Sequence, residues 1–230
     1  METSNFLELV EPATREAMNP HLRPVPLDEG TCLHEAGADI DYVYFPTQGI
    51  VTLLTSTQDG HSVGTGLLGR EGIVGSSLSG SPKAMDAAVV QVPGAAYRLP
   101  SRAFKGLYDE NPSFRSLIDK YNRIMWGLAQ QCAACNALHP LRGRLARWLL
   151  HMQARTDGVQ LRTTQANLAD LLGVRRTSVT LEENRLQGEG LIKISRGQIT
   201  ILNLDGLLAC ACECYDVHER RISHLTNGSA

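Results

Sequence analysis

The chain has 230 residues, of which 43% are hydrophobic and 20% are charged, and its formal net charge is −2. This balance excludes a disordered chain, and the length predicts one large or two small domains. No apolar run approaches the roughly 20 residues needed to cross a bilayer, and Met1–Val10 lacks the basic residues of a secretion signal. Six irregularly spaced cysteines fit a reducing compartment, so we expect a cytoplasmic protein without membrane contact.

Short apolar runs alternate with glycine-containing turn sequences between residues 25 and 100. Asp59-Gly60, which lies between two such runs, is a strong hairpin signal. Many short strands at close spacing predict a sandwich-like or barrel-like β domain. The predicted strands are Tyr42–Phe45, Ile50–Leu54, Val63–Leu68 and Ala87–Val92, with turns at 47–49, 58–60 and 93–94.

From Ser113 to Leu138 the hydrophobic residues recur at helical spacing and form two stripes. A surface helix needs only one stripe, so we expect one to pack on its own domain and the other on a second copy of the chain. The alternative is a helix enclosed in its own core. The predicted dimer seam is Leu117, Tyr121, Ile124, Leu128 and Cys135, and the second stripe is Phe114, Ile118, Met125, Ala129 and Cys132.

A further helix is predicted from Leu141 to about Asp157-Gly158. After it we expect two short helices, a hairpin and a helical tail from Leu207 to about Ile222.

The balance of charged residues also changes in this half of the chain. Residues 142–204 contain ten Lys and Arg but five Asp and Glu, a net charge of +5, whereas the remainder carries −7. This asymmetry favours a nucleic-acid-binding module joined to another domain, although arginines clustered by chance on solvated helix faces would give the same count.

The segment from Thr164 to Leu186 has the pattern of a helix-turn-helix. Such a motif needs a small residue where the helices cross, a glycine in the turn and an apolar anchor on the second helix. Ala169, Gly173 and Val179 meet these needs, and Thr164 is a suitable N-cap for the first helix. An ordinary helical hairpin would share this pattern.

Basic residues at two places distinguish a DNA-binding motif from that hairpin. The second helix opens with Arg175-Arg176-Thr177-Ser178, which places hydrogen-bond donors where bases and phosphates are met. Downstream, two short apolar runs flank Ser195-Arg196-Gly197-Gln198, which predicts a β-hairpin wing with a cationic tip. Together these features predict a winged DNA-binding domain.

Residues 168–180, LADLLGVRRTSVT, resemble the DNA-binding domain of the Crp/Fnr superfamily of bacterial transcription regulators. CNALHP at 135–140, RLARWLL at 144–150 and ACECY at 211–215 resemble it too, while YFP at 44–46 and GREGIVG at 69–75 are similar to its cyclic-nucleotide-type β-roll. The resemblance implies an α+β fold. Its expected parts are a jelly-roll-like β-roll sensor (1–112), a dimerisation helix (113–138), a winged helix-turn-helix (139–206), and a C-terminal helix and tail (207–230).

The resemblance implies a homodimer that binds a two-fold site in double-stranded DNA and regulates transcription, with RNA polymerase as a further partner. By position, Leu181 replaces the hydrogen-bond donor often found on the recognition helix, and Glu182 and Glu183 replace small or apolar residues. Arg176, Thr177 and Leu181 occupy the base-facing places of that helix by position, with Arg175 and Thr180 beside them. The full set of predicted DNA-binding residues is Thr164, Gln165, Arg175, Arg176, Thr177, Ser178, Thr180, Leu181 and Arg196.

Cyclic-nucleotide-binding members hold the phosphate with backbone amides and an Arg-Ser pair. Here no Arg occurs from Glu71 to Tyr97, and Lys83 is the only cation in that window. An anion needs both amides and a cation. We therefore expect neither cyclic AMP nor cyclic GMP to bind, and the effector is unknown. The candidate effector-pocket residues are Gly69, Arg70, Glu71, Gly72, Ser76 and Ser77.

The sequence predicts no cofactor, no metal and no enzymatic activity. An iron–sulfur cluster needs about four gathered thiolates, and Cys32 is the only cysteine before Cys132. Cys210, Cys214 and His218 have the spacing of one helix face, but we expect free buried thiols because ACECY resembles the ordinary family tail. Gly64-x-Gly66-x-x-Gly69 matches the glycine pattern of a dinucleotide-binding site. It lies among predicted hairpins, however, and not in the βαβ unit that such a site needs.

No other catalytic motif stands out in the sequence. The alternative function is an effector-binding module that acts through a protein partner. Such a module needs neither the wing nor Arg175-Arg176.

Overall fold

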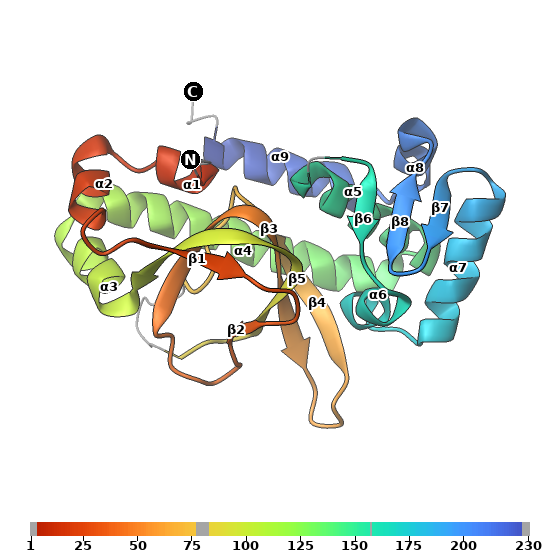
Figure 1. The fold of residues 1–230 in the computed structure, drawn as a ribbon, viewed down its shortest axis with the longest axis horizontal. Helices are drawn as coiled ribbons and strands as arrows, with labels where there is room; N and C mark the ends of the chain where they lie inside the picture. Colours follow the sequence, from red (N-terminus) through yellow and green to blue (C-terminus); the bar gives the residue numbers. More distant parts are fainter. Residues whose placement is uncertain (1–3, 77–82, 157, 227–230) are drawn as a thin grey trace.

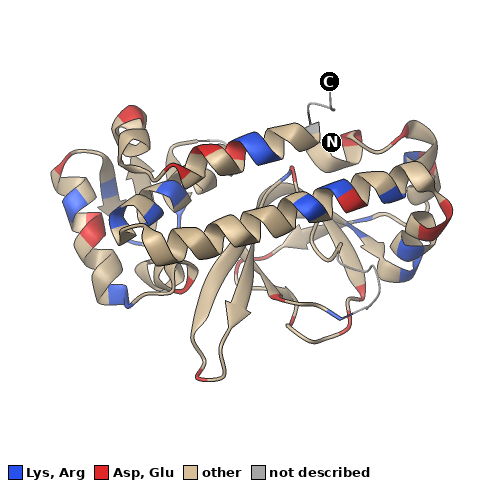
Figure 2. Ribbon diagram, turned by 180° about the vertical axis from the view of Figure 1, so that it is seen from behind, with Lys and Arg blue, Asp and Glu red and all other residues tan. Residues whose placement is uncertain are grey.

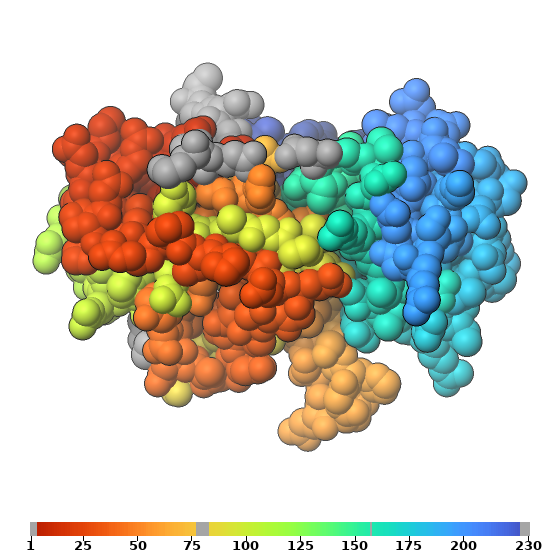
Figure 3. Space-filling view, in the orientation of Figure 1, coloured from red at the N-terminus to blue at the C-terminus, as the bar shows by residue number. Residues whose placement is uncertain are grey.

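The computed structural model describes residues 4–76, 83–156 and 158–226. A β-rich N-terminal part and a mainly helical C-terminal part are connected by one long helix, α4 (Figure 1). The space-filling view shows the two parts side by side, the N-terminal one in red to yellow and the C-terminal one in teal to blue (Figure 3). The N-terminal part contains α1 (Asn5–Glu8), α2 (Pro12–Met18), β1 (Arg23–Leu27), β2 (Cys32–His34), β3 (Tyr42–Ser56), β4 (Ser62–Leu68), β5 (Ala87–Pro100) and α3 (Ser101–Glu110).

The remaining elements follow α4 (Pro112–Leu138) and α5 (Leu141–Arg155) in the order β6 (Gln160–Arg162), α6 (Gln165–Leu172), α7 (Arg176–Gly188), β7 (Ile192–Ser195), β8 (Gln198–Ile201), α8 (Leu204–Cys210) and α9 (Cys214–Thr226). The strands of the roll are ordered β1-β5-β3-β4, with β2 also paired to β5, and the small C-terminal sheet is ordered β6-β8-β7. This architecture confirms the predicted α+β fold class with an N-terminal β-roll and a C-terminal helix-turn-helix. Within the described ranges, no helix has the length and apolarity to cross a membrane.

Two predicted turns lie inside long strands instead. The register between β3 and β5 shifts near the middle of both strands. Gly49 has a φ of +83°, and a Cβ there would lie 2.6 Å from the carbonyl oxygen of Val92. A Cβ at Gly94 would collide with the backbone of β3. These glycines permit bulges where the strands approach closely, so the turns predicted at 47–49 and 93–94 are wrong. The Asp59-Gly60 turn between β3 and β4 is confirmed.

Helix α4 packs both of its hydrophobic stripes on its own chain. Tyr121 is 1% exposed, and its hydroxyl accepts a hydrogen bond from the backbone N–H of Ile73 (3.0 Å) and donates to the Ile73 carbonyl (2.9 Å). The predicted dimer seam is therefore wrong at Tyr121, Leu128 and Cys135, which are buried within their own chain. Leu117 and Ile124 are half-buried against the same core.

The C-terminal helix explains why that seam is covered. α9 folds back along α4 (Figure 1), and the Arg221 guanidinium donates a hydrogen bond to the carbonyl of Gly127. Leu225 of α9 is buried in the cluster that also holds Tyr121 of the seam, and Leu117 and Ile124 pack against the same cluster. Helical periodicity in residues 113–138 cannot reveal this contact, because the covering residues lie about a hundred positions further along the chain.

The predicted helical tail is broken into two helices. Residues 211–213 are non-helical and separate α8 from α9. Cys210 therefore ends one helix, whereas Cys214 and His218 lie on the next, so the three do not form one helix face as their spacing predicted. His218 instead packs against His151, with ring centroids 4.2 Å apart.

Candidate nucleic-acid interface

Local sequence signals build the helix-turn-helix of α6 and α7. The Thr164 hydroxyl caps α6 by accepting a hydrogen bond from the backbone N–H of Asn167 at 3.1 Å. Gly173 ends α6 with a φ of 62°, the left-handed conformation that a glycine adopts without strain. Val179 and Leu186 anchor α7 in the core and are fully buried. The motif therefore has the parts that the sequence predicts.

The first turns of α7 present polar and cationic side chains to solvent. Arg175, Arg176 and Thr177 are exposed, and Leu181 is 52% exposed one turn later. Lys and Arg occur near both ends of α7 (Figure 2). Ser178 and Thr180 are half-buried, and the Thr180 hydroxyl donates back to the Arg176 carbonyl at 3.0 Å. Arg175, Arg176, Thr177 and Leu181 are therefore accessible at the start of α7. Ser178 and Thr180 are partly buried.

A buried carboxylate supports this outward surface. Glu183 is 1% exposed and accepts a hydrogen bond from Gln165 Nε2 at 2.7 Å, and Gln165 Oε1 accepts one from Arg176 Nε at 3.4 Å. Burial raises the pKa of Glu183, while the hydrogen bond from Gln165 opposes this shift. The chain of contacts orients the Arg176 side chain from behind. Sequence reasoning noticed that a carboxylate at residue 183 is unusual but did not find its partner.

The β7–β8 hairpin forms the predicted wing and is hydrogen-bonded to α7. Gly197, with a φ of 71°, closes the β7–β8 turn, and Arg196 at its tip is exposed. The backbone N–H of Ile194 donates to Gln187 Oε1 at 2.8 Å, which ties β7 to the end of α7. Thr164 is exposed at the start of α6, and Gln165 is half-buried beside it.

The DNA-binding part rests on the β3–β4 hairpin of the roll. A Cβ at Gly64 of β4 would lie 3.0 Å from Leu171 Cδ2 and 3.2 Å from Trp148, and a Cβ at Gly173 would lie 3.2 Å from Val63. A larger residue at either glycine would push these side chains apart by a few tenths of an ångström, and at Gly173 it would also be strained by the φ of +62°. Side chains of β3 and β4 consequently share a hydrophobic cluster with α5, α6 and α7.

One buried ion-pair network also joins the two parts. Arg155, at the end of α5, has a side chain that is 4% exposed, and its Nε lies 2.6 Å from Glu71 Oε1. Its Nη1 lies 3.7 Å from Glu219 of α9. Burial lowers the pKa of His151 below its ordinary value, while the contact with Glu219 at 3.1 Å opposes this shift.

Two of the predicted effector-pocket residues contact other parts of the chain. Glu71 pairs with Arg155, and the Arg70 carbonyl accepts hydrogen bonds from the backbone N–H of Phe6 (3.3 Å) and the Ser4 hydroxyl (3.2 Å). Gly69, Arg70, Glu71 and Gly72 do not line the cavity described next, whereas Ser76 does, and Ser77 lies outside the described residues.

A cavity with a volume of about 460 Å³ lies between the roll and α4. Its polar groups include the Ser76 hydroxyl, which donates to Asn122 Oδ1 at 2.9 Å, and the contact between His34 and Asp86 at 3.2 Å. Apolar groups of Met125 and neighbouring residues form much of the remaining wall. None of the described residues that line it is Lys or Arg. The cavity therefore favours a neutral ligand over an anion.

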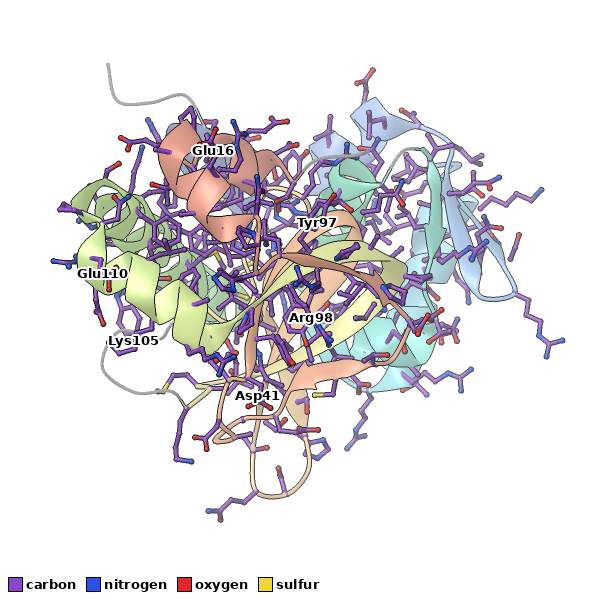
Figure 4. The ribbon with its side chains drawn as sticks, turned by 60° about the vertical axis from the view of Figure 1, so that its left-hand side comes forward. Glu16, Asp41, Tyr97, Arg98, Lys105 and Glu110 are labelled. Carbon is purple, nitrogen blue, oxygen red and sulfur yellow. The ribbon has the colours of Figure 1, made fainter. Side chains whose placement is uncertain are left out.

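The arginine of β5, Arg98, lines a different pocket. Arg98, labelled beside Tyr97 in Figure 4, has its guanidinium carbon 4.3 Å from the centre of the Tyr42 ring. It lines a separate pocket with Arg23 and Arg102. Arg98 therefore does not supply the cation that the effector cavity lacks.

Comparisons with known proteins agree with this arrangement. A family model of the cyclic nucleotide-binding domain matches residues 24–111, and a model of the Crp-like helix-turn-helix domain matches residues 143–210. A search of curated proteins gave no match.

Solved structures show the same fold. FixK2 from Bradyrhizobium japonicum has a TM-score of 0.72 at 15% identity, covering 83% of this chain and 98% of that one. A Crp/Fnr-family transcriptional regulator from Thermus thermophilus has a TM-score of 0.68 at 22% identity, covering 82% and 98%. The c-di-GMP-responsive global regulator CLP from Xanthomonas campestris has a TM-score of 0.67 at 17% identity, covering 83% and 99%.

A cyclic-nucleotide-type roll followed by a helix-turn-helix with a wing defines a two-domain transcription regulator. The chain belongs to the Crp/Fnr family, as the sequence resemblance predicted.

The buried pair between Arg155 and Glu71 generates a stability prediction. Glu71→Gln leaves a guanidinium with little access to water and only the more distant Glu219 as a charged partner. We expect the free energy of unfolding in urea to fall by about 3 kcal/mol. The matched control is Glu189→Gln, which breaks the surface pair with Arg142 and should change stability little. Equal effects of the two substitutions would contradict this role for the buried pair.

Proposed function

We propose that the protein is a sequence-specific DNA-binding transcription regulator that acts as a homodimer. The observation that supports this most directly is the exposed start of α7, where Arg175, Arg176 and Thr177 face solvent beside a wing tipped by Arg196. Residues 142–204, with their net charge of +5, would supply the electrostatic attraction to phosphates. A module that acts only through a protein partner has no need of this surface.

Within this interface, Arg176 and Arg196 are assigned different tasks. Arg176 lies on the helix that would enter the major groove, and its contact with Gln165 limits the directions that its guanidinium can take. Arg196 lies at the tip of a hairpin, where contact with the phosphate backbone is expected. Leu181 offers an apolar surface suited to a thymine methyl group.

These tasks predict different effects of alanine substitution. On an operator selected from genomic fragments, Arg176→Ala should cost about 1–3 kcal/mol of specific affinity and relax sequence preference. Arg196→Ala should weaken binding to specific and random DNA alike. It should also reduce the slope of log binding constant against log salt concentration by about 1. Arg220→Ala, an exposed arginine on α9, is the control for lost charge. Equal losses on both kinds of DNA for Arg176→Ala would remove it from base reading.

The proposed dimer contact is the outward face of α4, in place of the seam predicted from sequence. Trp126 is 69% exposed and Leu138 is 77% exposed, and Ala133 and Ala137 between them are exposed too. No Asp, Glu, Lys or Arg occurs from residue 124 to 141, and this half of α4 crosses the face shown in Figure 2. Small residues beside a large aromatic one allow two helices to approach closely.

A charge on this face should separate the dimer. Ala133→Glu adds a carboxylate to each helix at the proposed contact, so sedimentation should detect monomers, and operator binding should be lost because one half-site supplies too few contacts. Ala209→Glu adds the same charge to an exposed alanine of α8 and should leave a dimer. The operator should have half-sites about 10 base pairs apart, or a multiple of that spacing. An Ala133→Glu protein that remains dimeric contradicts the proposed face.

For the sensor domain we propose a ligand other than a cyclic nucleotide. The cavity between the roll and α4 holds Asp86 and no described Lys or Arg, and Glu71 is engaged by Arg155. A phosphate there would lack a compensating cation. Calorimetric titration with cyclic AMP or cyclic GMP at millimolar concentration should therefore give no saturable heat and no change in DNA affinity. Because the structurally similar CLP is c-di-GMP-responsive, c-di-GMP belongs in the same titration, and saturable micromolar binding of any of the three would contradict the proposal.

A further inference from the structure

Three cysteines and one histidine converge at the joint between α4 and α5. Cys135 lies in the last turn of α4, and His139 is the C-cap residue that follows it. Cys212 and Cys214 come from the break between α8 and α9 and from the start of α9. One ligand atom from each side chain lies within 4.8 Å of those of the other three.

The distances approach those of a tetrahedral metal site. Cys135 Sγ lies 3.5 Å from Cys212 Sγ, and Cys214 Sγ lies 3.5 Å from His139 Nδ1. A tetrahedral Zn²⁺ ion with Zn–S bonds of about 2.3 Å and a Zn–N bond of about 2.0 Å spaces its sulfurs about 3.8 Å apart and a sulfur and nitrogen about 3.5 Å apart. The remaining pairs of ligand atoms lie within 4.8 Å, so shifts of up to about 1 Å would bring all four to tetrahedral spacing. An iron–sulfur cluster places several ions between its ligands and needs them further apart.

Outer contacts orient two of these ligands. His139 Nε2 lies 3.1 Å from Glu213 Oε1, which favours a proton on Nε2 and leaves the Nδ1 lone pair directed at the cluster. The amide of Gln131 donates to Cys214 Sγ at 3.1 Å. Metal-bound histidines commonly have such a carboxylate partner.

A buried positive charge beside the cluster is otherwise incompletely compensated. Arg147 is 4% exposed, and its Nε and Nη2 have no hydrogen-bond partner among the described residues. It is close enough to act electrostatically on Cys135 and Cys212. Three thiolates, a neutral imidazole and a divalent ion together carry a charge of −1, which is complementary to this guanidinium.

We propose that Cys135, His139, Cys212 and Cys214 form a Cys₃His site for a single Zn²⁺-type ion. Binding converts three thiols to thiolates and releases their protons to solvent, with no transfer of electrons. The other group of suitable side chains, His151, His218 and Glu219, already has the Arg155 guanidinium 3.7 Å from its carboxylate. A resident cation disfavours a metal there.

The position of the site gives it a structural role. The backbone N–H of Cys212 contacts the carbonyl of Gly143 in the first turn of α5 at 3.4 Å, and a Cβ at Gly143 would lie 3.4 Å from that nitrogen. The cysteine-bearing segment therefore lies directly on α5. A bound ion would clamp the end of α4 to the start of α9 and fix the angle at which α5 leaves α4.

Metal content and cobalt spectroscopy of the full-length protein test the proposal. After incubation with zinc under reducing conditions and dialysis against a weak chelator, we expect about one zinc per chain. Co²⁺ in place of zinc should give the visible absorption of a tetrahedral ion and thiolate-to-metal bands in the near ultraviolet. This readout on the unsubstituted protein does not depend on any variant folding.

Matched serine variants locate the site. Cys214→Ser and Cys212→Ser should weaken zinc binding by more than about 100-fold, and Glu213→Gln by about tenfold. Cys210→Ser and Cys32→Ser, which change cysteines outside the cluster, should retain the metal, and circular dichroism checks folding in each case. The proposal is overturned if the chain retains no zinc, or if it forms a Cys135–Cys212 disulfide in place of binding zinc. It is also overturned if Cys210→Ser and Cys214→Ser lose equal amounts of zinc.

Discussion

The Arg155 guanidinium, almost completely removed from water, determines how the parts of this molecule fit together. A charge at that depth is tolerated only when carboxylates approach it closely. One is Glu71, from the roll, and another is Glu219, from the C-terminal helix, while the arginine itself ends α5 of the DNA-binding part. Three segments distant in sequence therefore meet at one side chain. Any movement of α5 relative to the roll must either carry these carboxylates along or expose the arginine to solvent.

Features with a local cause could be predicted from the sequence. The turn of the helix-turn-helix follows from Gly173, whose left-handed conformation ends α6, and the β3–β4 hairpin follows from Asp59-Gly60. Each depends on residues within a few positions of one another. Gly49 and Gly94 show the limit of this reasoning, because a glycine that permits a bulge and a glycine that forms a turn leave the same signal in the sequence.

Features that depend on distant partners could not be predicted. The seam proposed for α4 had correct helical periodicity, but α9 covers that side of the helix. Glu71 lies in a motif similar to a ligand-binding segment, yet its partner is 84 residues away. The cysteines of the proposed metal site are likewise separated by up to 79 positions, and the break at residues 211–213 that brings them together is not visible as a helix signal.

The contact of α6 with β4 has a thermal consequence. It is formed by apolar groups: Leu171 of α6 packs on Gly64, and Val63 of β4 packs on Gly173. Apolar contacts weaken on cooling because the hydrophobic free energy falls with temperature near and below room temperature. The docked arrangement should therefore be favoured in warm solution and loosen in the cold. Temperature can bias the placement of the recognition helix in a molecule of this construction even when the sensor cavity contains no ligand.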